Sequence, residues 1–141
     1  MAARGNLAYF EDVVLGGVLE TPAITVTEAH VTLYLGLTRE LAADASAVPD
    51  LLPLCLTTGL GWRIPQPPLV VLAFMGCEWH AVRPLRVGDT MYSRSRTVTK
   101  RSMREGGVIV EEREVIDQHD EVVQRGRFTF LVAKRPPAGA A

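Results

Sequence analysis

The sequence predicts one α+β domain in which an antiparallel sheet of five or more strands wraps around a single buried helix. Two observations lead to this prediction. The C-terminal half is predicted to form four long strands separated by turns, and residues 90–101 show the long polar/apolar alternation of a half-buried antiparallel strand. Residues 51–64 are almost wholly apolar, and a short helix that is apolar on every side belongs inside a core. A curved sheet is the layer available to bury that helix.

The composition is that of a soluble globular protein without a strong electrostatic bias. The chain has 141 residues, 48% hydrophobic and 22% charged, with a formal net charge of −1. This length suffices for a core without metal or disulfide crosslinks, and the balanced charge argues against nucleic-acid or anionic-membrane partners. Two cysteines without CxxC spacing form no disulfide framework, so we expect a cytoplasmic protein with Cys55 and Cys77 as reduced core thiols.

The N-terminal part predicts an irregular lead-in, one strand and one helix. Residues 1–17 show no periodicity, whereas residues 19–26 alternate as a strand does. Thr27 is a typical N-cap residue, and the apolar residues after it predict a helix that ends near Thr38. The small and polar residues 39–50 then predict a loop.

The rest of the chain predicts the buried helix and a meander. The helix spans residues 51–64 and is stopped by a proline cluster; its core-facing residues, expected to be nearly inaccessible, are Leu54, Leu56 and Leu60. Four long strands follow over residues 70–82, 90–101, 108–116 and 122–132. We therefore expect a single domain over residues 1–134 and a disordered tail over residues 135–141.

Three stretches in this order resemble the MaoC-like branch of the hot-dog fold. YFEDVVLGGVLETPAITVTEAHVTLYLGLT at Tyr9–Thr38 is similar to the opening strand and overlying helix of that family. GCEWHAVRPLRVGDTMY at Gly76–Tyr92 is similar to its strand, R-P-x-x-x-G-D-T turn and next strand. The third stretch is the closing pair of strands at Gly107–Ala133.

The resemblance implies an acyl-thioester substrate on coenzyme A or an acyl carrier protein. We expect no cofactor and no metal, since the sequence has no P-loop or GxGxxG segment and no His/Cys cluster with zinc spacing. The implied reaction is hydration or dehydration between 2-enoyl and 3-hydroxyacyl groups. In the family, an Asp-x-Asn-Pro-x-His segment after the overlying helix performs general acid–base catalysis. Backbone N–H groups at the start of the buried helix hold the thioester oxygen.

The corresponding segment of this chain departs from that pattern. Glu40 stands in place of the aspartate and Ala45 in place of the histidine, so the standard pair is absent. The family's His-Gly pair at the start of the buried helix corresponds to Thr58-Gly59, whose backbone N–H groups we expect to bind the substrate carbonyl. Substrate binding is therefore better supported than the usual chemistry.

Five residues are candidates for replacing the missing pair: Glu40, Asp44, Asp50, Glu78 and His80. Glu78 and His80 lie two positions apart on a predicted strand, so their side chains share one face and could form an acid–base couple. The alternative is that this face is solvent-exposed. The three carboxylates near the loop could equally be solvated residues or, for Asp50, a helix cap.

Two main functions remain open from the sequence. The chain is either an enzyme on acyl thioesters or related biosynthetic intermediates (dehydration, hydration, cyclisation or isomerisation), or a non-catalytic subunit that pairs with a complete MaoC-like hydratase. Thioester hydrolysis is a third possibility, for which Asp50 is the carboxylate nearest the buried helix. Because exposed sheet edges invite pairing, we expect a homodimer or a hetero-oligomer whose sheet continues across the interface.

Overall fold

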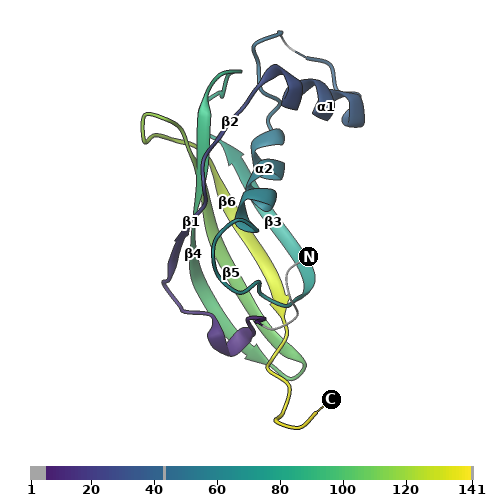
Figure 1. Cartoon of the computed structure of the whole chain (residues 1–141), viewed down its shortest axis with the longest axis vertical. Helices are drawn as coiled ribbons and strands as arrows, with labels where there is room; N and C mark the ends of the chain where they lie inside the picture. Colours follow the sequence, from purple (N-terminus) through teal and green to yellow (C-terminus); the bar gives the residue numbers. More distant parts are fainter. Residues whose placement is uncertain (1–5, 43, 141) are drawn as a thin grey trace.

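A computed structural model describes residues 6–42 and 44–140 of the chain. The expectations for residues 1–5, 43 and 141 lie outside the described residues. The elements, in chain order, are η1 (Phe10–Asp12), β1 (Val18–Glu20), β2 (Ile24–Thr25), α1 (Glu28–Thr38), α2 (Leu52–Gly61), β3 (Val71–Ala81), β4 (Thr90–Met103), β5 (Gly106–Ile116) and β6 (Val122–Val132) (Figure 1).

The strands form one antiparallel sheet in the order β1-β4-β5-β6-β3, and β2 also pairs with β4. This confirms the predicted α+β architecture. The first strand was expected to run unbroken over residues 19–26, which was wrong. It is divided into β1 and β2 on either side of Pro22, which has no N–H to donate to a sheet ladder.

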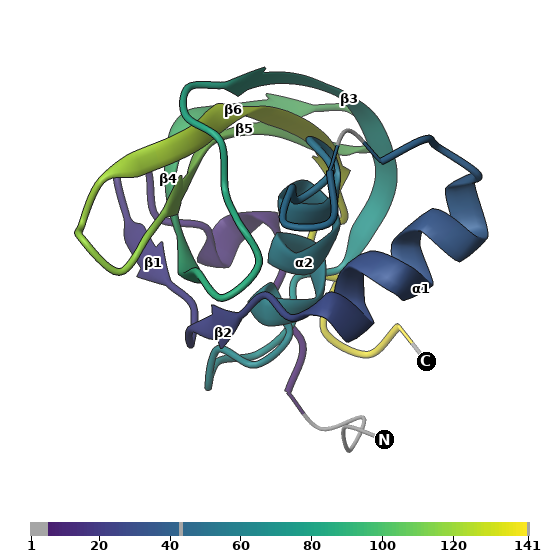
Figure 2. The same ribbon diagram turned by 90° about the horizontal axis from the view of Figure 1, so that it is seen from above.

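The sheet curls around α2, and α1 lies outside the curl on its open side (Figure 2). The side chains of α2 that face the sheet are buried: Leu52, Pro53, Thr57 and Leu60. They pack in a cluster that includes Val26, Met91, Val115 and Val123. The expectation that Leu54 and Leu56 are nearly inaccessible was wrong, since both are only half-buried. The helix is thus buried on one side and not all round.

The cysteine prediction also needs correction. Cys55 on α2 and Cys77 on β3 are both free thiols, but both are exposed rather than in the core. A cysteine is compatible with either environment, so composition could not decide its burial.

Helix α1 begins and ends as its sequence predicts. Thr27 is the N-cap, and its backbone N–H donates to Nδ1 of His30 at 3.0 Å. Arg39 ends the helix in the left-handed conformation, with φ of 62°, and its N–H bonds to the Leu35 carbonyl at 2.9 Å.

Strand β3 forms one edge of the sheet and exposes apolar side chains. Its first half carries Val71, Leu72, Phe74 and Met75, which are 44% to 57% exposed. No other described strand pairs with its outer side. The opposite edge is β1, which has only three residues. A long apolar edge is a surface on which another strand can pair.

The C-terminal end of the chain lies against the N-terminal segment. The Arg135 guanidinium bonds to both carboxylate oxygens of Asp12 at 2.6 Å, and its backbone N–H bonds to Glu11 at 2.9 Å. Residues 135–140 have no regular secondary structure. Within the described part of the chain, neither helix has the length and hydropathy needed to cross a membrane.

Candidate functional site

The first turn of α2 is where the loop after α1 joins the sheet. The loop is held by backbone bonds from Val48 N–H to the Leu85 carbonyl at 3.2 Å and from Val87 N–H to the Ser46 carbonyl at 2.9 Å. The carbonyl oxygen of Asp50 accepts a bond from Gln124 Nε2 of β6 at 2.7 Å. The position of α2 is therefore fixed by the sheet as well as by apolar packing.

The phenol of Tyr34, which packs against the core cluster that includes Leu52, lies within electrostatic reach of Glu40, Asp50 and Cys55. Burial raises the pKa of the Tyr34 phenol to about 12, and a hydrogen bond with the Glu40 side chain and the charge of that carboxylate act in the same direction. Cys55 and Asp50 raise the pKa further. The phenol consequently stays protonated at neutral pH and can donate to Glu40. Two predicted residues, Glu40 and Asp50, thus both act on the Tyr34 phenol.

Asp50 does not cap α2, as the sequence suggested it could. The N-cap position is Leu51, and no side-chain capping bond is formed there. The Asp50 side chain is exposed, which leaves its carboxylate beside Tyr34. Instead, a proline in the first helical turn favours the start of the helix, because its fixed φ suits that turn.

Asp44 belongs to a turn and not to the cluster around Tyr34. Its Oδ1 accepts bonds from the Ser46 hydroxyl at 2.6 Å and the Ser46 N–H at 2.7 Å, and these bonds hold the pKa of Asp44 below its usual value. Nη1 of Arg86 lies 4.0 Å from Oδ2. These hydrogen bonds stabilise the turn at residues 44–47. A carboxylate that is held ionised in this way is a poor proton donor at neutral pH.

Thr58 and Gly59 are not at the start of α2, so their expected alignment with the family's His-Gly pair was wrong. They follow Leu52, the first helical residue, by six and seven positions, where backbone N–H groups bond to carbonyls within the helix. The Thr58 hydroxyl donates to the Cys55 carbonyl at 2.6 Å. Their N–H groups therefore cannot serve as the free donors that the sequence predicted.

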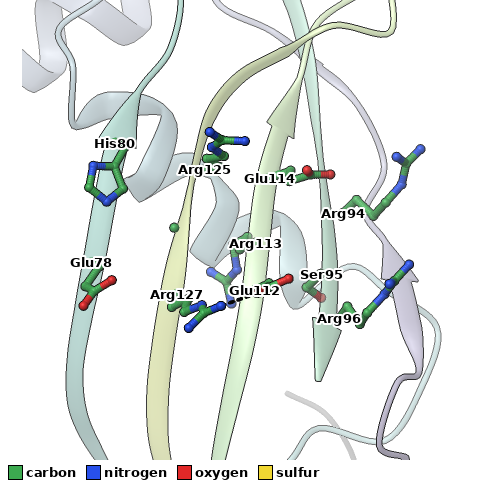
Figure 3. Close-up of a pocket in the computed structure, with 11 residues that line it drawn as sticks. Glu78, His80, Arg94, Ser95, Arg96, Glu112, Arg113, Glu114, Arg125 and Arg127 are labelled. Atoms are coloured by element: carbon green, nitrogen blue, oxygen red, sulfur yellow. Dashed lines mark hydrogen bonds and ion pairs between the residues drawn. The ribbon is translucent and has the colours of Figure 1, made fainter. Parts of the chain in front are cut away.

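Glu78 and His80 do share one face of β3, as their spacing predicts, but this face is turned away from α2. Trp79 between them packs against the core cluster around α2 and bonds to Gln124. Side chains alternate along a strand, so both neighbours of Trp79 point to the outer surface (Figure 3). The prediction that they reach the start of α2 was therefore wrong.

On that outer surface, Glu78 and His80 belong to a pattern of charged stripes. The register pairs Glu78 with Arg127 and His80 with Arg125. Across the next strands the stripes alternate in sign, with Glu112 and Glu114 on β5 and Arg94 and Arg96 on β4 (Figure 3). Arg127 bonds to Glu112 at 2.7 Å. The charges line an open hollow of about 430 Å³, and their local compensation is typical of a solvated sheet face.

Sequence reasoning missed an ion pair between the sheet and α2. Arg113 and Glu111 of β5 bond at 3.0 Å with side chains only 14% and 18% exposed, and Arg113 Nη1 lies 3.3 Å from the Thr57 hydroxyl of α2. The signal was present, because Glu111 and Arg113 stand between Ile109 and Val115 at the two-residue spacing of one strand face. Sequence alone does not tell which face is inside.

Three comparisons place this geometry among known proteins. No family model matches the chain, and no curated protein is similar to it in sequence. Among solved structures, a monoamine oxidase regulatory protein from Archaeoglobus superposes with a TM-score of 0.83 and 25% identity, over 93% of this chain and 97% of that one. A MaoC-like dehydratase from Rhodospirillum rubrum superposes with a TM-score of 0.77 and 19% identity, over 92% and 99%. The chain has a MaoC-like hot-dog fold. The resemblance noted in the sequence is thereby confirmed.

One further neighbour of this MaoC-like chain is a complex. The 3R-hydroxyacyl-ACP dehydratase complex of Mycobacterium tuberculosis superposes with a TM-score of 0.69 and 10% identity, over 84% of this chain and 97% of that one. In the MaoC-like chain, the described residues contain no group of three or more His, Cys, Asp or Glu side chains arranged to hold a metal ion.

Proposed function

We propose that this MaoC-like chain binds an acyl thioester, carried by coenzyme A or an acyl carrier protein, and catalyses hydration, dehydration or a related proton-transfer reaction with non-standard residues. The observation that carries the proposal is the packing of Tyr34 against the core cluster that includes Leu52 of the first turn of α2, with Asp50 directly before this turn and the Glu40 carboxylate close enough to act on the phenol. The MaoC-like fold supports the substrate class, since similar structures include a dehydratase and an (R)-hydratase.

Glu40 is the proposed proton-transfer group. In the dehydration direction its carboxylate takes the proton from C2 of the 3-hydroxyacyl group and passes this proton to the 3-hydroxyl. The C3–O bond then breaks, the C2=C3 double bond forms, and the hydroxyl leaves as water. Tyr34 keeps its own proton and donates a hydrogen bond to Glu40, which orients the carboxylate. Ala45 supplies no imidazole, so one of the two groups of the family's pair has no equivalent at its usual position.

This gap gives the first test. A general acid–base group contributes about 10²–10⁴-fold to a rate, so the isolated chain should hydrate crotonyl-coenzyme A at least about 100-fold more slowly than a MaoC-like hydratase with a complete pair. A spectrophotometric assay of both proteins under the same conditions measures this ratio. Equal rates would show that another residue has taken the place of the histidine.

The second candidate is a non-catalytic subunit that pairs with a complete MaoC-like hydratase. The exposed apolar edge of β3 favours it, because an edge of eleven residues can pair with a strand of another subunit. Co-expression with a complete homologue, followed by size-exclusion chromatography, tests this candidate. A stable mixed complex that turns over substrate faster than either protein alone would support the subunit role. Turnover of substrate by the isolated chain without any partner would exclude this role.

A further inference from the structure

A chain of hydrogen bonds connects edge strand β3 with the residue before α2. Trp79 Nε1–H donates to Oε1 of Gln124 at 2.9 Å, and Nε2–H of Gln124 donates to the carbonyl oxygen of Asp50 at 2.7 Å. Gln124 is only 4% exposed, yet both ends of its amide are bonded. Because an unpaired buried amide is costly, the two bonds hold each other in place.

The receiving carbonyl is one that the helix itself does not use. The first intrahelical bond of α2 runs from Cys55 N–H to the Leu51 carbonyl at 3.1 Å, so the Asp50 carbonyl lies one residue outside the helix. The peptide between Asp50 and Leu51 is therefore held by Gln124 from the sheet. This peptide directly precedes Leu52, which belongs to the core cluster that Tyr34 packs against.

We propose that Gln124 is a positioning residue, which fixes the Asp50–Leu51 peptide and the first turn of α2 for a bound acyl thioester, and that Trp79 is coupled to the same site through it. The inference rests on the proposed function for the identity of the ligand. Gln124 is buried and acts through the Asp50 carbonyl. Neither Gln124 nor Trp79 belongs to the acid–base group.

The first test needs no ligand. In Gln124→Met, a side chain of similar length without polar atoms, amide hydrogen exchange at residues 50–55 should become at least tenfold faster, while residues 109 and 132 keep their protection relative to global unfolding. Ser93→Ala removes another buried polar side chain, 3% exposed in β4, and is the control. Equal exchange at residues 50–55 in both variants would overturn the proposal. If Gln124→Met does not fold, Trp79→Phe, which removes the indole N–H together with part of the aromatic ring system, is measured instead, with a smaller acceleration expected.

The second test uses Trp79 as a reporter. The chain has two tryptophans, and Trp62→Phe removes the other one, which is 76% exposed. In this background, titration with butyryl-coenzyme A should change the Trp79 emission. With Gln124→Met added, the change should be lost and the Kd should rise at least fivefold.

The two tests separate the inference from the proposed function. An unchanged Kd and an unchanged emission response in the Gln124→Met protein would overturn the positioning role even though the thioester binds. Absence of butyryl-coenzyme A binding to the wild type would contradict the proposed function. The exchange experiment would then still decide whether Gln124 holds the first turn of α2.

Discussion

The guanidinium carbon of Arg113 lies 4.1 Å from the centre of the Phe128 ring, and the same guanidinium reaches Thr57 of α2. An ion pair with Glu111 thus lies between the sheet and the helix. Removing one partner of a mostly buried pair leaves an uncompensated charge, so Arg113→Met should lower the free energy of unfolding by about 3 kcal/mol. The double variant with Glu111→Leu should recover most of this loss in urea denaturation. A single variant as stable as the double variant would contradict the role assigned to the pair.

Position 126 requires glycine because β3 and β6 approach each other closely there. A Cβ at this position would overlap the Glu78 carbonyl oxygen and would lie 2.7 Å from Cε3 of Trp79. Gly126→Ala should therefore destabilise the protein by about 3 kcal/mol or more, because backbone atoms have to move. The control is Gly36→Ala in the last turn of α1, where nothing lies within 4 Å; it should stabilise the protein by about 0.4–1 kcal/mol. Equal thermal midpoints for the two variants would contradict this packing.

The Asp89 carboxylate gives a pH-dependent prediction. It accepts the Arg86 N–H at 2.8 Å and the Gln118 amide at 2.9 Å, and these bonds lower its pKa. A lowered folded-state pKa means that the stabilisation is complete above the ordinary carboxyl pKa of about 4 and is lost as the pH falls through the lowered value. Asp89→Asn should cost about 1 kcal/mol at neutral pH, and this difference should disappear in strong acid. Denaturation curves across the pH range would refute this if the difference were constant.

Strand β3 gives a prediction about assembly. Met75 is 57% exposed on the free apolar edge, so Met75→Lys should weaken a dimer that pairs along β3 and should shift the protein toward the monomer in sedimentation velocity. Leu15, which is 60% exposed near the opposite edge, supplies the control Leu15→Lys, expected to leave the assembly unchanged. A wild type that sediments as a monomer at micromolar concentration would contradict self-association and would favour pairing with a different subunit.

The sequence was sufficient to locate the helices and the long strands, but it did not indicate which face of the sheet is buried. The expected bounds of β3, β4, β5 and β6 agree with the structure to within a few residues, because long apolar or alternating runs are separated by turn residues such as Arg83-Pro84 and Gly106-Gly107. The two-residue spacing of Glu78 and His80 shows that they share a face, but not that this face is the outer one. That depends on tertiary packing of Trp79 against the core.

The candidate site was predicted only in part for a related reason. Glu40 and Asp50 could be predicted as candidates from their place in the loop. Tyr34 could not, because in the sequence it occupies an ordinary apolar position of α1. The predicted role of Thr58 and Gly59 was wrong because the Thr-Gly pair was aligned with the start of the buried helix. The structure starts α2 six residues earlier, with Pro53 in its first turn.

The central claim is that Glu40 transfers a proton at C2 of an acyl thioester, and solvent exchange measures this step directly. Butyryl-coenzyme A is incubated with the protein in D₂O, and deuterium incorporation at C2 is followed by NMR. The wild type should catalyse the exchange, Glu40→Gln should be at least about 100-fold slower, and His80→Gln on the outer face of the sheet should match the wild type. Exchange that is unaffected by Glu40→Gln, or that is lost in His80→Gln, would contradict the account.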